Sequence, residues 1–239
     1  MSKRPHRQQS FATPAGVLVA CLLALSACGS ERAGNGIASQ SATRALARVE
    51  SAAADAATVH VEGAVAGPAR ALAIDMELER GQGGRGTIAL GGLRARLVQD
   101  AGWLYVKANP ALLRRFVGAA AARRLAGRWL KGPADHGPFA SLASLTDLRT
   151  LLRETLSSHR GPTTAGTGRV GGRPAVALRD TITGATLYAS ATGTPYPLAL
   201  RRPGRDGGTL RFDRWNRAVS LEAPPNPLNI KAVFALKGL

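Results

Sequence analysis

The segment LAIDMELE, Leu72–Glu79, decides the fold predicted for this chain. Its side chains alternate between two kinds, with Leu72, Ile74, Met76 and Leu78 set against Ala73, Asp75, Glu77 and Glu79. Because successive side chains of a strand point to opposite faces, this period of two predicts a strand with one buried and one solvated face. Such strands are typical of antiparallel sheets, which can pack on one side only. The apolar row therefore needs a covering layer.

The same period extends to both sides of this segment. Val59, Val61 and Val65 alternate with polar residues before it, and short apolar runs follow it at 87–90, 93–99 and 103–107. Turn sequences separate these runs, including a Gly-Gly pair at 91–92 that is a hairpin signal. Together they predict an antiparallel meander of about five strands.

Three amphipathic helices are expected beside the strands. Ser41 is a candidate N-cap for a helix whose apolar residues recur from Ala42 to Ala53. Asn109-Pro110 combines an N-cap with proline at the first helical position, and Gly127 stops that helix. SLTD at 144–147 resembles a capping box, and a leucine stripe follows it to Leu156. The two later helices are the expected cover for the apolar row.

Strands are expected again after the third helix. Apolar segments occupy 175–180, 186–191, 198–202, 209–212 and 218–222, with Gly, Pro and Asp in the turns between them. The order of helix, strands, two helices and strands predicts an α+β protein built on an antiparallel sheet, with helices packed on one side.

The first 30 residues contain a targeting signal. Basic residues at positions 3, 4 and 7 precede an uncharged run, Ala15 to Ala27, of about 13 residues, which is too short to span a bilayer as a helix. The run ends in Leu25-Ser26-Ala27-Cys28, which fits the bacterial lipobox. We expect a lipoprotein signal peptide over 1–27 and acylation of Cys28. The alternatives are an ordinary signal peptide that contains a cysteine, or an uncleaved anchor.

Residues 28–40 are then expected to form the acylated cysteine and a flexible tether, with a reach of roughly 20 Å for a dozen Gly/Ser-rich residues. A folded domain follows over 41–225. The remaining residues, 226–239, form a basic and apolar tail with three open roles: capping a cavity, touching the membrane or adding a strand. Cys21 leaves with the signal, so the mature chain has no disulfide.

The chain is strongly basic. Its formal net charge is +17, and removal of three basic signal residues leaves 29 Lys and Arg against 15 Asp and Glu, or +14. Export makes nucleic acid a poor partner, so anionic lipid headgroups or wall polymers fit this charge better. The alternative is general solvated charge, because the arginines are scattered instead of forming one block.

No residue pattern indicates catalysis, and we expect no enzyme activity, no metal and no cofactor. His60, His136 and His159 have no metal-ligand spacing, and the chain lacks a G-x-S-x-G elbow and a phosphate-binding loop. The acidic residues Asp75, Glu77 and Glu79 share one face of a strand. They suit an acid/base pair or calcium, but also a solvated outer face neutralised by arginine.

Several short phrases appear in a familiar order. They are the lipobox, VHVEG (59–63), WLYVK (103–107), RWL (128–130), SLTDL (144–148), GRPAVAL (172–178), LYASATGTPYPLAL (187–200) and FDRWNRAVSLEAPP (212–225). In this order the chain resembles the actinobacterial LppX/LprG-type lipoproteins of the LolA-like superfamily. The resemblance covers nearly the whole mature chain, and only the lipobox is specific by itself.

This resemblance implies a strongly curved, unclosed half-barrel sheet whose concave face is covered by helices, with a lipid-binding domain over 41–225. It implies an apolar cavity for acyl chains and carriage of lipids across the envelope, but no catalytic residues. From periodicity, the expected cavity lining is Leu72, Ile74, Met76, Leu78, Phe116, Leu145, Leu148 and Leu152. The expected headgroup contacts are Arg114, Arg115 and Arg123.

The function predicted from sequence is therefore a monomeric lipoprotein, anchored through Cys28 to the extracytoplasmic face of the cell membrane, that binds lipid or glycolipid acyl chains. The alternative is a regulatory or scaffold lipoprotein that senses the state of the envelope and binds a protein partner with the same fold. A filled core with a large exposed apolar patch would favour the alternative.

Overall fold

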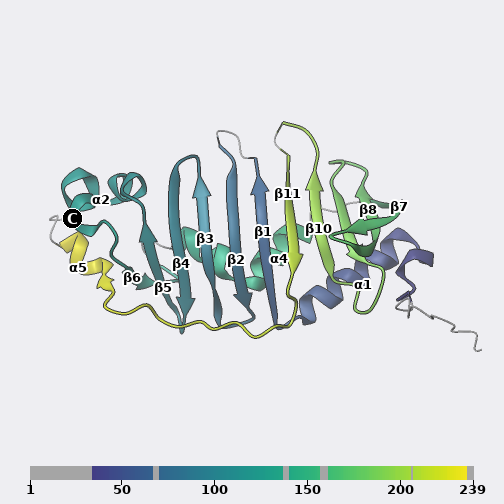
Figure 1. Ribbon diagram of the computed structural model, residues 1–239, viewed down its shortest axis with the longest axis horizontal. Coiled ribbons are helices and arrows are strands. Elements are labelled where there is room, and N and C mark those ends of the chain that lie inside the picture. Colours follow the sequence, from purple (N-terminus) through teal and green to yellow (C-terminus); the bar gives the residue numbers. More distant parts are fainter. Residues whose placement is uncertain (1–33, 67–69, 137–139, 157–160, 206, 236–239) are drawn as a thin grey trace, which may run out of the picture. The chain divides into compact units, whose positions relative to one another are not determined.

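One twelve-stranded sheet runs through the described part of the chain, in the order β12-β6-β5-β4-β3-β2-β1-β11-β10-β9-β8-β7 (Figure 1). The computed structural model describes residues 34–66, 70–136, 140–156, 161–205 and 207–235. All of them belong to one compact unit, Arg32–Leu239. The strands are β1 (Thr58–Val65), β2 (Leu72–Glu79), β3 (Gly83–Leu90), β4 (Leu93–Asp100), β5 (Trp103–Ala108), β6 (Leu130–Pro133), β7 (Pro162–Val170), β8 (Arg173–Asp180), β9 (Thr186–Ser190), β10 (Pro197–Arg202), β11 (Gly208–Asp213) and β12 (Leu228–Asn229).

Five α-helices and two 3₁₀ turns are described. They are α1 (Ala42–Asp55), α2 (Pro110–Leu125), α3 (Ala140–Ala143), α4 (Leu148–Leu156), α5 (Ile230–Ala235), η1 (Ile37–Ser39) and η3 (Ser144–Thr146). In Figure 1, α1 and α4 lie together behind the sheet. No described helix has the length and apolar character needed to span a membrane.

Two meanders join to make the sheet. The strands β1 to β6 form one, the strands β7 to β11 form the other, and β1 pairs with β11 between them. Neighbouring strands are antiparallel throughout, except that β12 runs parallel to β6. Among the described strands, β7 and β12 are the two edges and do not pair with each other, so the sheet is unclosed. The predicted fold, a curved and unclosed antiparallel sheet with helices on one face, is confirmed.

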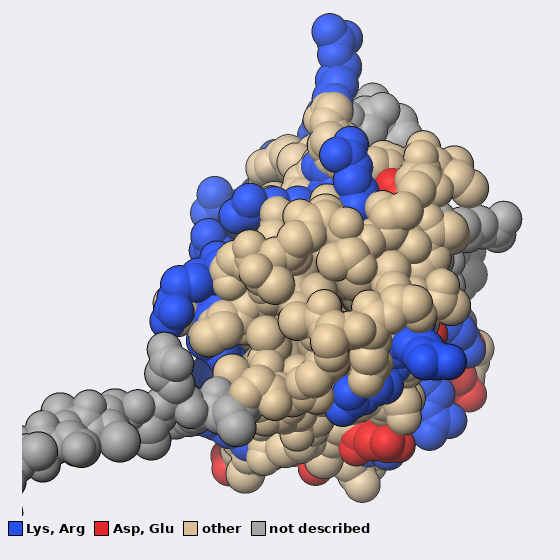
Figure 2. Space-filling model, turned by 90° about the vertical axis from the view of Figure 1, so that its right-hand side faces the viewer, with Lys and Arg blue, Asp and Glu red and all other residues tan. Residues whose placement is uncertain are grey.

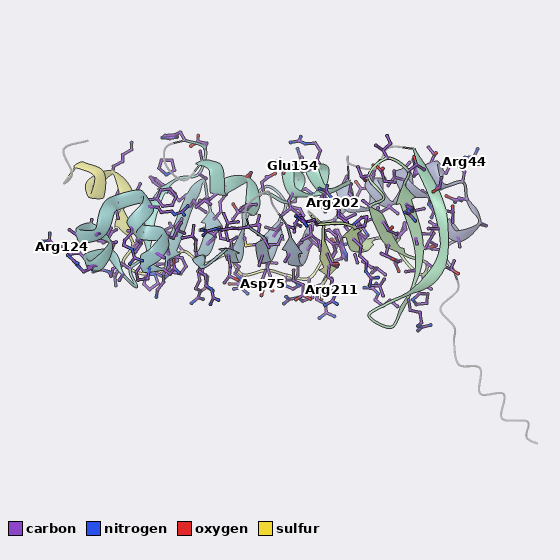
Figure 3. All side chains as sticks on the ribbon, turned by 90° about the horizontal axis from the view of Figure 1, so that it is seen from above. Arg44, Asp75, Arg124, Glu154, Arg202 and Arg211 are labelled. Atoms are coloured by element: carbon purple, nitrogen blue, oxygen red, sulfur yellow. The ribbon has the colours of Figure 1, made fainter. Side chains whose placement is uncertain are left out.

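The alternation in β2 produces the two faces that it predicts. Ile74, Met76 and Leu78 are buried, and the last two are fully inaccessible to solvent. Asp75 points to the opposite side of the sheet from Glu154 of α4, as Figure 3 shows, and Arg211 of β11 points the same way as Asp75. The helices therefore cover the apolar face, and the acidic row of β2 lies on the open face.

The expected N-caps of the first two helices are confirmed. The Ser41 hydroxyl accepts a hydrogen bond from the Arg44 amide at 3.4 Å, and the Asn109 side chain accepts one from the Leu112 amide at 3.0 Å. Within α2, Gly118 adopts φ 77° and ψ 171°, which breaks the helix into two parts. This kink was not predicted from the sequence.

The expected start of the third helix is wrong. Residues 144–146 form the turn η3, and α4 begins only at Leu148, where the Asp147 carboxylate accepts a hydrogen bond from the Thr150 amide at 2.6 Å. The physical reason is Thr146, which is fully buried and donates through its hydroxyl to the Ala143 carbonyl at 2.7 Å. Asp147 is therefore the cap, in place of Ser144.

The expected strand at 218–222 is also wrong. This segment has no regular structure, and in Figure 1 it runs along the lower ends of the strands between β11 and β12. It follows a fixed turn, because the Trp215 indole donates to the Pro197 carbonyl at 3.0 Å and the Asn216 amide donates to the Thr58 carbonyl at 3.0 Å. The short strand β6 and the edge strand β7 were not predicted.

The expected flexible tether does not extend to Gln40. From Gly34 the chain is held against the turn between β9 and β10, where the Asn35 side chain donates to the Ser190 carbonyl at 2.8 Å and to the Gly193 carbonyl at 2.9 Å. Ile37 is 1% exposed and belongs to the core. The hydrogen bonds of Asn35 and the burial of Ile37 therefore hold the segment from Gly34 to Gln40 against the folded domain.

The C-terminal tail adds a strand, which is one of its three expected roles. Leu228 and Asn229 pair with Leu130 and Lys131 of β6. The next residue, Ile230, is 3% exposed and packs in the same core cluster as Ile37. The core of this unit thus draws on both ends of the described chain.

Candidate functional site

A cleft with a volume of about 430 Å³ opens between α1 and α4. Small-molecule sites typically measure about 300–1,000 Å³, so this cleft is large enough to hold a ligand. It is lined by Glu50, Ala53, Ala54, Arg80, Leu148, Arg149, Leu152, Arg153 and Leu156.

The floor of the cleft is apolar because of the spacing on α4. Leu148, Leu152 and Leu156 recur at one-turn intervals and lie on one face of the helix. They are 2%, 5% and 5% exposed. Opposite them, α1 contributes Ala53 and Ala54, whose single methyl groups leave space between the two helices. Large side chains on one helix facing small ones on the other thus create the cleft.

Charged groups surround the cleft. Arg80 follows β2 directly and donates from Nε to the Ala56 carbonyl at 2.9 Å, with a second donation from Nη2 to the same oxygen. Ala56 is the C-cap of α1, so this cation satisfies a carbonyl at the negative end of the helix. Burial raises the pKa of the Glu50 carboxyl above its ordinary value. Arg149 and Arg153 are exposed, and neither has an ion-pair partner in the described part of the chain.

Eight apolar residues were expected to line a lipid cavity. Two of them, Leu148 and Leu152, line this cleft. Among the others, Met76 and Leu78 are fully buried in the core, Ile74 is 8% exposed, and Leu72 and Leu145 are partly buried. Phe116 lies on α2 and is 41% exposed. These six residues do not line the cleft.

The three arginines expected at a headgroup lie elsewhere. Arg114, Arg115 and Arg123 are exposed on α2, and none of them lines the cleft. Sequence reasoning missed Arg149 and Arg153, although a signal was present. Both follow a leucine of the α4 stripe by one position, so a basic row runs beside the apolar row.

The open face of the sheet carries a second cluster of polar groups, at the junction of β2, β1 and β11. The His60 ring is almost fully buried between two carboxylates, with Nδ1 at 2.6 Å from an Asp213 oxygen and Nε2 at 2.9 Å from an Asp75 oxygen. Glu77 pairs with Arg85 at 2.7 Å and with Arg214 at 2.8 Å. Glu77 is thus neutralised by arginine, as the solvated-face interpretation expected.

The remaining predicted groups form no candidate metal site in the described residues. No cluster of three or more His, Cys, Asp and Glu among them is placed to hold a metal ion. His136 is exposed beside Asp135, and its hydrogen bond at 2.6 Å lowers the pKa of that carboxyl. Cys28 and His159 lie outside the described residues.

Comparisons with known proteins identify the fold. LprF from Mycobacterium bovis superposes with a TM-score of 0.51 at 14% identity, over 77% of this chain and 96% of LprF. The chain has the LppX/LprG-type fold. The expected resemblance is thereby confirmed at the level of architecture.

Other comparisons are weaker. The lipoprotein LppX from Mycobacterium tuberculosis gives a TM-score of 0.44 at 14% identity, over 74% of this chain and 96% of LppX. A conserved protein from Thermus thermophilus gives 0.37 at 13% identity, over 80% of this chain and 98% of that protein. No family model and no curated protein sequence matches this chain.

Proposed function

We propose that this chain is a membrane-anchored extracytoplasmic lipoprotein that binds an acyl chain in the cleft between α1 and α4. The observation that carries this proposal is the leucine stripe of α4 facing the alanines of α1 across about 430 Å³. The LppX/LprG-type fold supports it.

Burial of methylene groups supplies the affinity. Each buried methylene contributes about 0.8 kcal/mol, so ten contribute about 8 kcal/mol. Association costs at least about 4 kcal/mol in lost freedom of motion, which leaves about 4 kcal/mol, or a dissociation constant near 1 mM. Binding in the micromolar range therefore requires additional contacts to the head of the ligand.

Native mass spectrometry of residues 29–239, purified from a related host, tests the proposal. The expected result is a monomer with stoichiometric lipid that organic extraction releases. The variant Ala54→Trp should lose the lipid, because the indole fills the cleft from an exposed position on its wall. The matched control is Ala47→Trp, an exposed alanine of the same helix that does not line the cleft, and it should retain the lipid.

A lipid-free monomer that also fails to take up added fatty acid would contradict the proposal. That result would favour the alternative of a regulatory or scaffold protein. The supporting observation for the alternative is β7, which is exposed along its length and has no neighbour on its outer edge among the described strands. Figure 2 shows that the β7 end of the molecule is largely uncharged between groups of Lys and Arg. Such an edge suits strand addition by a partner.

The anchoring and its location form a separate part of the proposal. Acylation of Cys28 should incorporate labelled palmitate and keep the protein in the membrane fraction of whole cells. The variant Cys28→Ser should lose both the label and the membrane association. Retention of the label would contradict lipidation at this residue, whereas membrane association without the label would favour an uncleaved anchor.

A further inference from the structure

Helix α4 presents two parallel rows of side chains at the cleft. Leu148, Leu152 and Leu156 form the apolar row, and Arg149 and Arg153 form a basic row displaced by one residue. Residues four apart lie one above the other on a helix surface, so the two guanidinium groups are neighbours. Both line the cleft, and both are exposed to solvent.

The basic row has no partner of its own. Within the described residues, the side chains of Arg149 and Arg153 form no hydrogen bond and no ion pair. Like charges at this spacing destabilise a helix, so the pair weakens α4 without a compensating contact. Glu154 is next to Arg153 in sequence, but it does not line the cleft, and in Figure 3 it points outward from the helix layer. An anion at the mouth of the cleft would supply the missing partner.

The other two charged groups of the cleft do not compete for this role. Arg80 is committed to the Ala56 carbonyl through two donors. Glu50 is the single carboxylate of the lining, and it forms no ion pair with Arg149 or Arg153 among the described residues. The cleft thus combines an apolar floor with two unpaired cations at its rim.

We propose that the cleft selects single-chain amphiphiles with an anionic head, whose chain lies on the leucine row and whose head bridges Arg149 and Arg153. This inference rests on the proposed function. The volume of about 430 Å³ lies in the lower part of the range for ligand sites, which favours one chain over two. Guanidinium groups bind both carboxylates and phosphates through paired hydrogen bonds, so the head can be that of a fatty acid or of a phosphorylated lipid.

Three probes with the same twelve-carbon chain test this selectivity in titration calorimetry on residues 29–239. Laurate carries a carboxylate, dodecyl phosphate carries a phosphate, and dodecanol carries no charge. At least one of the two anions should bind at least about tenfold more tightly than dodecanol, which is the effect of one hydrogen bond to a charged group. A preference between laurate and dodecyl phosphate then distinguishes a free fatty acid from a phosphate-bearing lipid.

Charge-removal variants locate the effect. The double variant Arg149→Gln/Arg153→Gln should lose about tenfold in affinity for the preferred anion and leave dodecanol binding within about twofold. The matched control is Arg114→Gln/Arg115→Gln, which removes the same charge from exposed positions on α2 and should change neither value. Circular dichroism and thermal unfolding verify that both variants fold.

Three outcomes overturn the inference in distinguishable ways. If dodecanol binds as tightly as both anions, the headgroup selectivity is refuted while the acyl-binding function stands. The same conclusion follows if the Arg149/Arg153 variant binds the anions like the unmodified protein. If no probe binds at millimolar concentration, the proposed function and this inference fail together.

Discussion

The variant His60→Leu should lower the free energy of unfolding by about 2 kcal/mol. His60 lies on β1, and its ring joins Asp75 of β2 to Asp213 of β11 through contacts of 2.9 and 2.6 Å. In its imidazolium form the ring donates one hydrogen bond from each nitrogen to these two carboxylates. Leucine occupies a similar volume but donates neither bond.

The magnitude follows from the exposure of the partners. A hydrogen bond to a charged group contributes about 1.5–3 kcal/mol, so two such bonds contribute at least about 3 kcal/mol in a buried setting. The carboxylates of Asp75 and Asp213 have side-chain exposures of 67% and 56%, so water replaces part of the lost interaction. The ion pair between Asp213 and Arg214, at 3.5 Å, also remains. These two effects reduce the expected loss to about 2 kcal/mol.

Urea denaturation of residues 29–239 at neutral pH measures this loss, and calorimetry should show a melting temperature lower by about 4–8 °C for a domain of this size. The control is His136→Leu, because His136 makes a similar contact of 2.6 Å with Asp135 but is exposed. The control should stay within about 0.5 kcal/mol of the unmodified protein. Equal losses for the two variants would refute the argument that the buried bridge between three strands stabilises the sheet.

Three further outcomes are expected. Gly63→Ala should destabilise the protein by at least about 2 kcal/mol in urea denaturation, since its φ is 143° and a Cβ there meets the backbone of β11, whereas Gly168→Ala, with open space around it, should not. Ile37→Ala should cost about 3 kcal/mol, against almost nothing for Ile182→Ala, which is 74% exposed; equal values would mean that the Gly34–Gln40 segment contributes no core. Glu50 has a raised pKa, so the folded state holds its proton more tightly and stability should fall as the pH rises through and above 4.5; Glu50→Gln should remove this component in denaturation series at different pH values.

Strong local patterns in the sequence predict the parts of the fold that they control directly. The alternation of β2 places Met76 in the core and Asp75 on the open face, and Asn109 caps α2 as expected. Such signals are reliable because period and capping depend on a few neighbouring residues.

The errors occur where tertiary contacts decide. Strand β7 is exposed on both faces, so its Thr- and Gly-rich sequence carries no alternation. Val219 and Leu221 are partly buried and alternate with exposed residues, as they would in a strand. The segment that carries them crosses the lower ends of the strands, however, and pairs with no strand among the described residues. The register of a strand requires a partner, and a single segment does not specify one.

The candidate site also has one part that local sequence patterns predict and one part that depends on tertiary contacts. The leucine stripe that reaches Leu148 and Leu152 was predicted from helical spacing on one segment. The cleft itself depends on the approach of α1 to α4, because the alanines of α1 become a wall only when the two helices face each other. Arg149 and Arg153 line the cleft only because α1 faces α4. Their position beside the leucine stripe was therefore not sufficient to identify them as cleft residues from the sequence.

The pairing of β1 with β11 has a consequence for biogenesis. His60 pairs with Asp213 and Val61 pairs with Phe212. The pairing that joins the two meanders therefore brings together residues that are far apart in the sequence. The hairpins from β1 to β5 can form from local contacts, but their outer partner is among the last segments to leave the ribosome. Non-local pairing of this kind slows folding and leaves the chain open for longer. For the export proposed above, this delay is an advantage, because a chain that has not closed its sheet is still able to pass through a translocation channel.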